Sequence, residues 1–438
     1  MAAPMTVTSR SRGGSTDWQP QPIRNLNDIG LTHGFLADMT LKYMYIRGQV
    51  TGAQIAEDMK IPFATVLSSI LDFLKRERMC EVTGSGGLGA AAYQYVITSK
   101  GTERAREQLE RNSYIGAAPV PWDDYINSIK LQGTRRLRVN EQMMRRALAH
   151  MTLDERIFSK IGPAVNSGKS IFLYGPPGNG KTTIAESVGR MILGNDMYIP
   201  YAVEVDGQII KVYDEINHEI VKDSDQLPST GSQKPDQRWL RIRRPVIMVG
   251  GELTMDGLEL AQDPVNKYYE APFQMKANGG MFLIDDFGRQ QIRPRDLLNR
   301  WIVPMEKNVD FLQLSTGRKI EVPFEVLLVF STNLPPRDLV DEAFLRRIRH
   351  KIEISSPSFD SFREIFVDVC QRRNITFDEQ AMRYLLQEYY IKKNRKLRAN
   401  HPRDLIDQLM DISSYSGEEP QLSRELIDRA ADSYFVDL

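Results

Sequence analysis

A glycine-rich stretch in the middle of the chain has the residue types and spacing of a phosphate-binding loop. It reads Gly175-Pro-Pro-Gly-Asn-Gly180-Lys181-Thr182 and matches the pattern G-x-x-x-x-G-K-[ST]. Glycines let successive backbone N–H groups point inward around phosphates, and the N-terminus of the following helix adds partial positive charge. We expect Lys181 to reach the β- and γ-phosphates of ATP and the Thr182 hydroxyl to ligate Mg²⁺. The residues predicted to bind the nucleotide are Gly175, Pro176, Pro177, Gly178, Asn179, Gly180, Lys181, Thr182 and Thr183.

A loop of this kind needs acidic side chains beside it to hold the metal and to activate water. The stretch "GGMFLIDDFGRQ" supplies them, because the apolar residues Met281 to Ile284 predict a buried strand that ends at Asp285 and Asp286. We expect Asp285 to hold magnesium through its water shell and Asp286 to orient and deprotonate the attacking water. Two adjacent aspartates can also simply end a strand in a turn. The upstream phosphate loop favours the catalytic interpretation.

The elements that must position these residues follow a strand-then-helix pattern from residue 151 onward. The segments "SIFLY", "RPVIMVGG", "GMFLIDD" and "EVLLVFSTN" are short, continuously apolar and bounded by glycine or polar residues, as buried parallel strands are. The pattern predicts an α/β fold with a parallel sheet wrapped by helices. Beyond residue 355 the strand pattern stops, and four amphipathic stretches near 361–372, 377–390, 402–413 and 422–434 predict a separate helical domain.

The region before this sheet has a different organisation. Residues 33–110 follow the order helix, helix, helix, hairpin, helix, which is similar to a winged helix-turn-helix. Its basic and acidic residues nearly balance, and the helix expected to read DNA begins "PFATVLSSI", without Arg, Lys, Asn or Gln. A protein-docking module is therefore favoured over a DNA reader. Basic stretches at 135–146 and 389–403, the second beside Tyr389 and Tyr390, keep nucleic acid as an alternative partner.

With these motifs in order, the sequence resembles the AAA+ ATPase family. "VLLVFSTNLPP" is similar to the family's sensor strand, which places Asn333 where a polar residue positions water near the γ-phosphate. "DEAFLRRIRHKIEI" looks like the stretch with the arginine finger, and Arg346 and Arg347 are equal candidates for acting on a neighbour's nucleotide. "NHPRDLIDQL" resembles the second sensor, with Arg403 reaching the γ-phosphate from the lid.

Each arginine also has a simpler interpretation. Arg346 and Arg347 could belong to an ordinary basic helix end, and Arg403 could pair with Asp404 or Asp407. The guanidinium group nevertheless suits both proposed tasks, because a phosphoryl transition state spreads negative charge over its equatorial oxygens. The order of the motifs along the chain favours the catalytic assignments together.

Two features of this sequence differ from the usual AAA+ pattern. The second acid of the family's acidic motif is usually glutamate, whereas Asp286 is one methylene shorter, which predicts slow hydrolysis or a shifted geometry. Hairpins are expected around Asp206-Gly207 and around Thr316-Gly317. The second hairpin, before the Asn333 strand, is similar to an insertion of the AAA+ branch that includes MoxR-like chaperones and McrB-like proteins. Surface decoration is the simpler account of both hairpins.

Composition limits the partners and the compartment. Lys and Arg together number 57, as do Asp and Glu, so no net field draws the chain toward nucleic acid or membrane. Cys80 and Cys370 are too few for a disulfide scaffold and fit a reducing compartment, so we expect a cytoplasmic protein. No stretch approaches 18 apolar residues, and we expect no membrane span.

These observations combine into one prediction of domains and function. We expect a disordered tail at 1–29, a winged helix at 30–111, a linker at 112–150, a P-loop NTPase domain of the AAA+ type at 151–355 and an all-α lid at 356–438. The resemblance implies an ATP- and magnesium-dependent ATPase that assembles into a homo-oligomeric ring, most simply a hexamer, and remodels an unidentified protein client. The alternatives are a DNA-associated motor or regulator and a slow, nucleotide-gated scaffold.

Overall fold

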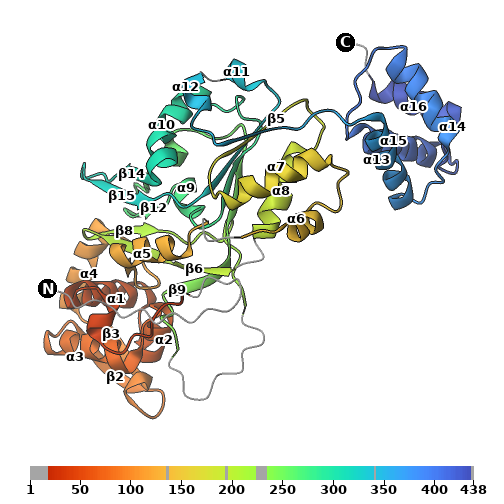
Figure 1. Cartoon of the computed structure of the whole chain (residues 1–438). Helices are drawn as coiled ribbons and strands as arrows, with labels where there is room; N and C mark the ends of the chain where they lie inside the picture. The colour runs from red at the N-terminus through yellow and green to blue at the C-terminus, as the bar shows by residue number, and fades with distance from the viewer. Residues whose placement is uncertain (1–17, 135–137, 193–195, 223–233, 340–341, 436–438) are drawn as a thin grey trace.

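A five-stranded parallel sheet forms the centre of the molecule. The computed structural model describes residues 18–134, 138–192, 196–222, 234–339 and 342–435 (Figure 1). The strand order is β10-β13-β16-β5-β17, and all four pairings are parallel. The strands are β5 (Ile171–Tyr174), β10 (Val246–Val249), β13 (Met281–Ile284), β16 (Leu327–Thr332) and β17 (His350–Glu353). Four of them were predicted from apolar runs, whereas β17 is short, polar at three of its four positions, and was missed.

Side chains alternate along the central strands, so the sheet buries both faces. On β13, Phe282 and Ile284 join a core cluster with Trp301, while Met281 and Leu283 join a second cluster on the opposite face with Ile184. The helices that cover the sheet are α6 (Glu141–Ala147), α7 (Glu155–Asn166), α8 (Lys181–Ile192), α9 (Phe273–Lys276) and α10 (Pro294–Lys307), with the short α11 (Pro336–Leu339) and α12 (Glu342–Leu345) following β16. Continuous apolar runs are therefore required here, as in other doubly covered parallel sheets.

The strand order determines which loops meet. Because β16 lies between β5 and β13 with all three parallel, their carboxyl ends lie at one edge of the sheet. In register, Thr332 of β16 is opposite Tyr174 of β5, and Phe330 is opposite Ile284 of β13. The loops that begin at these ends carry residues 175–180, Asp285, Asp286 and Asn333, and Lys181, Thr182 and Thr183 follow in the first turn of α8.

The N-terminal elements form a separate core around a small antiparallel sheet of order β1-β3-β2. They are η1 (Leu26–Ile29), α1 (His33–Arg47), β1 (Val50–Thr51), α2 (Gly52–Asp58), the π-helix η2 (Phe63–Leu67), α3 (Ser68–Arg76), β2 (Cys80–Ser85), η3 (Ala90–Ala92), β3 (Tyr93–Ile97) and α4 (Ser99–Arg111). The order of helices and hairpin is the one expected from the sequence. In Figure 1 these red and orange elements lie at one end of the molecule.

Part of the predicted disordered tail is folded. From Trp18 onward the chain is described, and Trp18 packs edge-on against Trp239 with ring centroids 5.0 Å apart. Ile29 is fully buried, and the buried guanidinium of Arg238 donates to its carbonyl oxygen at 2.9 Å. The prediction of disorder was therefore wrong for residues 18–29, because a polar, proline-containing sequence gains order here from distant aromatic partners. The rest of the predicted tail, residues 1–17, lies outside the described residues.

The predicted linker is also largely integrated into the fold. Within residues 112–150, β4 (Val120–Pro121) pairs in parallel with β7 (Ala202–Val205), and α5 (Trp122–Gln132) buries Tyr125 and Ile129 completely. Only α6 of the basic stretch 135–146 is helical, and residues 135–137 lie outside the described residues. Prolines punctuate this segment without making it a free connector.

Both predicted hairpins are present. β7 (Ala202–Val205) and β8 (Gln208–Lys211) turn at Asp206-Gly207, and β14 (Val309–Gln313) pairs with β15 (Lys319–Pro323). Arg318 of the second hairpin forms an ion pair with Asp206 of the first, so the hairpins contact one another near their turns. The remaining strands of this region are β6 (Asp196–Pro200), β9 (Trp239–Arg243), β11 (Ala261–Gln262) and β12 (Tyr269–Glu270), with η5 (Asp256–Leu258) between β10 and β11.

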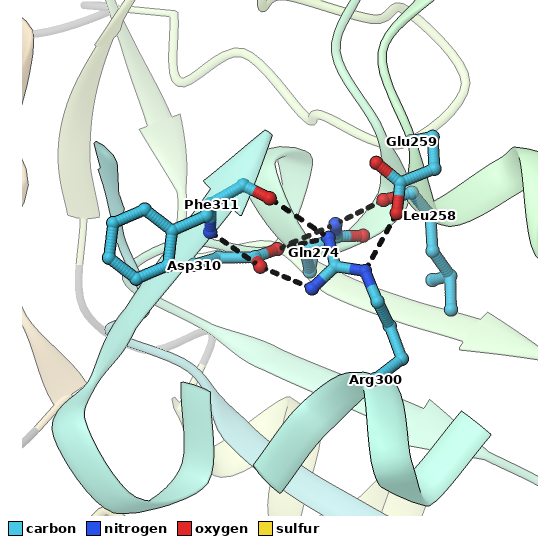
Figure 2. A network of polar contacts seen from close by, with 6 residues as sticks. All are labelled: Leu258, Glu259, Gln274, Arg300, Asp310 and Phe311. Carbon is cyan, nitrogen blue, oxygen red and sulfur yellow. Dashed lines mark hydrogen bonds and ion pairs between the residues drawn. The ribbon is translucent and has the colours of Figure 1, made fainter. Parts of the chain in front are cut away.

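A buried polar network fixes the second hairpin to the body of the domain (Figure 2). Asp310 at the start of β14 is 1% exposed and accepts from Arg300 of α10 at 2.5 Å. Arg300 also donates to Glu259 at 2.7 Å, and Gln274 donates to both Asp310 and the Leu258 carbonyl. Because these charges are paired and hydrogen-bonded, the base of the hairpin is held rigidly against α10.

The C-terminal helices pack around their own core, as predicted. They are α13 (Phe359–Arg372), α14 (Glu379–Leu386), the π-helix η6 (Gln387–Ile391), α15 (His401–Ser416) and α16 (Arg424–Tyr434). Figure 1 shows them in blue, as a compact group at the opposite end from the N-terminal elements. Among the described residues, none of the helices combines the length and apolarity that a membrane crossing requires.

Candidate functional site

The glycine-rich loop connects β5 directly to α8. Gly175 has φ +140° and Gly178 has φ +79°, conformations that side chains rarely adopt. A β-carbon on Gly175 would lie 2.3 Å from the Ile354 carbonyl oxygen, so this position also excludes other residues by space. α8 starts at Lys181, which directs its free N–H groups into the loop. The local sequence thus builds a cradle of backbone donors.

Lys181 is buried at 6% exposure inside this loop. Its ammonium group donates to the carbonyl oxygens of Gly175 at 3.0 Å and Pro176 at 2.9 Å, and to Asn333 Oδ1 at 2.7 Å. Burial lowers the pKa of Lys181, and the nearby carboxylates of Asp285 and Asp286 oppose that shift. A desolvated ammonium with only neutral hydrogen-bond acceptors is well suited to receive an anion.

The Thr182 hydroxyl lies against the first acidic residue. Its Oγ1 is 3.0 Å from both carboxylate oxygens of Asp285. A hydroxyl and a carboxylate in contact are the hard oxygen ligands that magnesium takes in nucleotide sites. The structure therefore brings together the two residues predicted to hold the metal, although they are far apart in the sequence.

Asp286 and Asn333 form the second predicted contact. Asn333 Nδ2 donates to Asp286 Oδ1 at 2.9 Å, while the Asn333 oxygen accepts from Lys181. A continuous chain of polar contacts, Lys181–Asn333–Asp286, thus spans the edge of the sheet. Asp286 is exposed and Asn333 is partly exposed, so both can reach a bound molecule. This arrangement can polarise and deprotonate a water held next to a phosphate.

The loop that precedes α15 touches the outer side of the phosphate loop. Arg398 Nη1 donates to the Pro177 carbonyl oxygen at 2.6 Å, and the Asn400 backbone N–H donates to the Gly178 carbonyl oxygen at 2.9 Å. The sequence alone does not distinguish Arg398 from the other basic residues of the stretch 389–403.

Asn179 adds a side-chain contact to the same junction. It is 3% exposed, and its Oδ1 accepts from the Ala399 backbone N–H at 3.1 Å. A β-carbon on Gly178 would lie 2.1 Å from Asn400 Oδ1, so the close approach of the loop before α15 requires glycine there. The C-terminal helices are thereby attached to the loop predicted to hold phosphates.

Arg403 lies in the first turn of α15 and is paired locally. Its guanidinium contacts Asp404 at 2.9 Å and is 63% exposed. This is the simpler of the two interpretations given by the sequence. Of Arg398 and Arg403, it is Arg398 that contacts the phosphate loop in this structure.

The structure separates the two candidate arginines after α12. Arg347 donates to Glu306 of α10 at 2.6 Å and is partly buried. Arg346 is exposed. The sequence could not distinguish adjacent arginines, whereas the geometry leaves Arg346 turned toward solvent.

Two pairs of adjacent tyrosines, Tyr268–Tyr269 and the Tyr389–Tyr390 pair of the basic stretch, make contacts within the fold. Tyr269 is 1% exposed and hydrogen-bonds Ser315 of the β14–β15 loop, and Tyr268 packs edge-on against Tyr114. Tyr390 is 3% exposed in the core of the C-terminal helices, and the Tyr389 hydroxyl donates to Asp428 at 2.9 Å. Burial excludes Tyr390 from base stacking, whereas Tyr389 is partly buried at the edge of the helical core and its stacking on a base stays a prediction.

Comparison with known proteins gives two kinds of sequence match. The profile of a family described as a domain of unknown function, DUF8689, matches residues 358–433. Spastin from Drosophila persimilis and spastin from Drosophila pseudoobscura pseudoobscura are each 31% identical over 111 residues, which cover 24% of this chain and 12% of the spastin. Spastin is an AAA ATPase. This similarity supports a relationship to the AAA+ ATPases. The chain spans only a small part of these relatives.

Solved structures of NtrX from Brucella abortus are also similar to this chain. The complex of NtrX with ADP is 12% identical, with a TM-score of 0.38, and the match covers 75% of this chain and 57% of NtrX. A second NtrX structure is 12% identical, with a TM-score of 0.36, and the match covers 75% of this chain and 59% of NtrX.

Proposed function

We propose that the chain binds ATP at residues 175–183 and hydrolyses it with magnesium. The observation that carries this proposal is the convergence of Lys181, Thr182, Asp285, Asp286 and Asn333 at one edge of the sheet. The relationship to the AAA+ ATPases supports it independently.

The residues present fit a magnesium–nucleotide complex. A buried lysine surrounded by neutral acceptors needs an anion, and the Thr182–Asp285 pair offers oxygen ligands beside it. Thr182 and Asp285 would hold the magnesium, which neutralises phosphate charge when it is bound. Lys181 orients the phosphates, and the loop N–H groups bind their oxygens.

Asp286 is proposed to accept the proton of the attacking water. Its carboxylate is fixed by Asn333 Nδ2, and Asn333, which directly follows β16, can also orient that water. The shorter aspartate is thus held by a neighbouring amide, which gives it a defined position despite the missing methylene.

The Asp286→Asn substitution tests this role. We expect kcat for ATP to fall about 100-fold or more, because the amide cannot take the proton, while nucleotide affinity stays within about twofold. Phosphate release and fluorescent-nucleotide titration measure the two effects. Asp338→Asn, an exposed aspartate on α11, is the control and should turn over normally. Wild-type activity in Asp286→Asn would remove Asp286 as the base.

We propose that the C-terminal helices act as a lid over the nucleotide. The contacts of Arg398 and Asn400 with Pro177 and Gly178 support this, because they connect the lid to the backbone that would bind phosphate. Arg398 already lies at the loop, while Arg403 would have to release Asp404 to reach the γ-phosphate. Either guanidinium could stabilise transition-state charge from this side.

We propose further that the active form is a homo-oligomeric ring, most simply a hexamer, in which a neighbour's Arg346 completes each site. The exposure of Arg346 and the engagement of Arg347 with Glu306 favour this assignment. We assign these functions to the domains predicted from the sequence, which are a winged helix at 30–111, a nucleotide-binding domain at 151–355 and the lid at 356–438. Cys80 and Cys370 are free and buried, as expected for a cytoplasmic protein.

We propose that the ring remodels a protein client and that the N-terminal module recruits this client. The exposed positions of η2 and α3 are Ala64, Thr65, Ser69, Asp72 and Arg76, whose single acidic and single basic side chains offer no net positive surface for phosphates. Arg145 of the basic stretch 135–146 is held by Glu141 and Glu155, which weakens a nucleic-acid role for that stretch.

ATP turnover with and without nucleic acid tests the choice between protein and DNA. We expect single- and double-stranded DNA to change kcat by less than about twofold at physiological salt, because basic and acidic residues nearly balance in the module. A tenfold stimulation by either form would overturn the protein-remodelling proposal in favour of a DNA motor.

A further inference from the structure

The turn that carries the two acids has an unusual backbone. Asp286 has φ +47°, in the left-handed region that non-glycine residues seldom occupy. Such a conformation is strained and persists only where the surroundings fix it. The residues that hold this turn therefore decide where the Asp286 carboxylate points.

The sheet fixes one side of the turn. The Phe287 N–H donates to the Ser331 carbonyl oxygen at 2.7 Å, and the Thr332 hydroxyl donates to the Phe287 carbonyl oxygen at 2.7 Å. Before the turn, the Asp285 N–H donates to Val249 of β10 at 2.9 Å. These bonds come from the strands that flank β13.

A single side chain, Gln290, fixes the other side. Its Nε2 donates to the Asp285 carbonyl oxygen at 2.8 Å, and its Oε1 accepts from the Gly288 N–H at 2.8 Å. The two bonds bracket Asp286 and Phe287. An uncharged amide both donates and accepts, which neither a carboxylate nor an aliphatic side chain of this length can do.

We propose that Gln290 is a positioning residue for ATP hydrolysis. It holds the backbone on both sides of Asp286, so that the carboxylate stays 2.9 Å from Asn333 Nδ2 and Asp285 stays 3.0 Å from Thr182 Oγ1. Gln290 acts through the backbone and contacts neither carboxylate. This inference rests on the proposed ATPase function, and it predicts an effect on turnover rather than on nucleotide binding.

The neighbouring residue provides a matched control. Gln291 has the same chemistry and lies in the same loop, but its side chain is exposed. If substitution of Gln290 lowers activity and substitution of Gln291 does not, the loss is caused by the two bonds from Gln290 to the turn. A general perturbation of the loop would lower activity in both variants.

Three variants of the full chain test the proposal: Gln290→Met, Gln290→Glu and Gln291→Met. Met keeps the length of the side chain and removes both bonds, whereas Glu keeps an acceptor for Gly288 and loses the donor to Asp285. We expect kcat to fall about tenfold or more in both Gln290 variants, since misplacing a reacting group by about 1 Å can cost 100-fold. The Kd for a fluorescent ADP, measured without magnesium, should stay within twofold, and Tm should stay within a few degrees. Gln291→Met should match the wild-type chain in every measurement.

The possible outcomes separate this inference from the proposed function. A kcat within twofold of wild type in Gln290→Met overturns the positioning role. A weakened Kd that parallels the loss of kcat assigns Gln290 to the shape of the whole site instead and also overturns it. If Gln290→Met does not fold, Gln290→Glu decides, because its shape is nearly that of glutamine. A wild-type chain without ATP turnover overturns the proposed function itself, and this inference with it.

Discussion

Lys181→Ala is expected to abolish measurable nucleotide binding. The ammonium group is buried within the phosphate loop and contacts only neutral acceptors, so its removal takes away the cation that would meet the β- and γ-phosphates. A charge-assisted hydrogen bond contributes about 1.5–3 kcal/mol, and losing contacts to two phosphates corresponds to a Kd at least about 100-fold weaker. Titration of a fluorescent ATP analogue by polarisation measures the change.

The control for this prediction is Lys160→Ala, which removes an exposed lysine on α7. It should bind nucleotide as the wild-type chain does. The Tm of both variants shows whether the substitution has unfolded the loop. This check is needed because Lys181 also donates hydrogen bonds to two backbone carbonyl oxygens and to Asn333. A folded Lys181→Ala chain that still binds within threefold of wild type would show that the nucleotide does not occupy this loop.

Arg346→Ala is expected to stop turnover and leave nucleotide binding intact. A guanidinium that reaches a phosphoryl transition state is worth about 10³–10⁵ in kcat. Arg347→Ala is the matched control, because its neighbouring guanidinium is engaged with Glu306 of the same chain, and we expect a loss of less than about tenfold. Phosphate release by the two purified variants makes the comparison.

Mixing experiments show whether Arg346 acts on a second copy. A Lys181→Ala chain offers an intact arginine, and an Arg346→Ala chain offers an intact loop, so a mixture of the two inactive proteins should regain part of the turnover. If the reverse assignment holds, Arg347→Ala will be the inactive variant. Normal kcat in both arginine variants would contradict the shared site.

The phosphate loop and the acidic strand could be predicted because each consists of residues that are contiguous in the sequence. Gly175 to Thr182 needs only a preceding strand and a following helix, and both are local features. That Asp285 meets Thr182 follows from the parallel order of β13, β16 and β5, since parallel strands end at one edge. The sequence implied this order only through the resemblance to AAA+ proteins.

Other roles depend on tertiary contacts that no local pattern encodes. Arg398 and Arg403 are five residues apart in one basic stretch, and only the path of the loop before α15 brings Arg398 to Pro177. Gln290 was unremarkable in the sequence, because its importance comes from two backbone groups in a left-handed turn. The sequence around Trp18 resembles a disordered tail, because the contact that orders it is with Trp239, which is distant in the sequence.

The central claim is that this site hydrolyses ATP with magnesium, and phosphate release by the wild-type chain tests it most directly. The assay compares wild type and Lys181→Ala, purified in parallel, at saturating ATP with and without excess EDTA. We expect saturable turnover by the wild-type chain, which EDTA abolishes and which Lys181→Ala lacks. Phosphate release that is equal in the two proteins, or unaffected by EDTA, would contradict it.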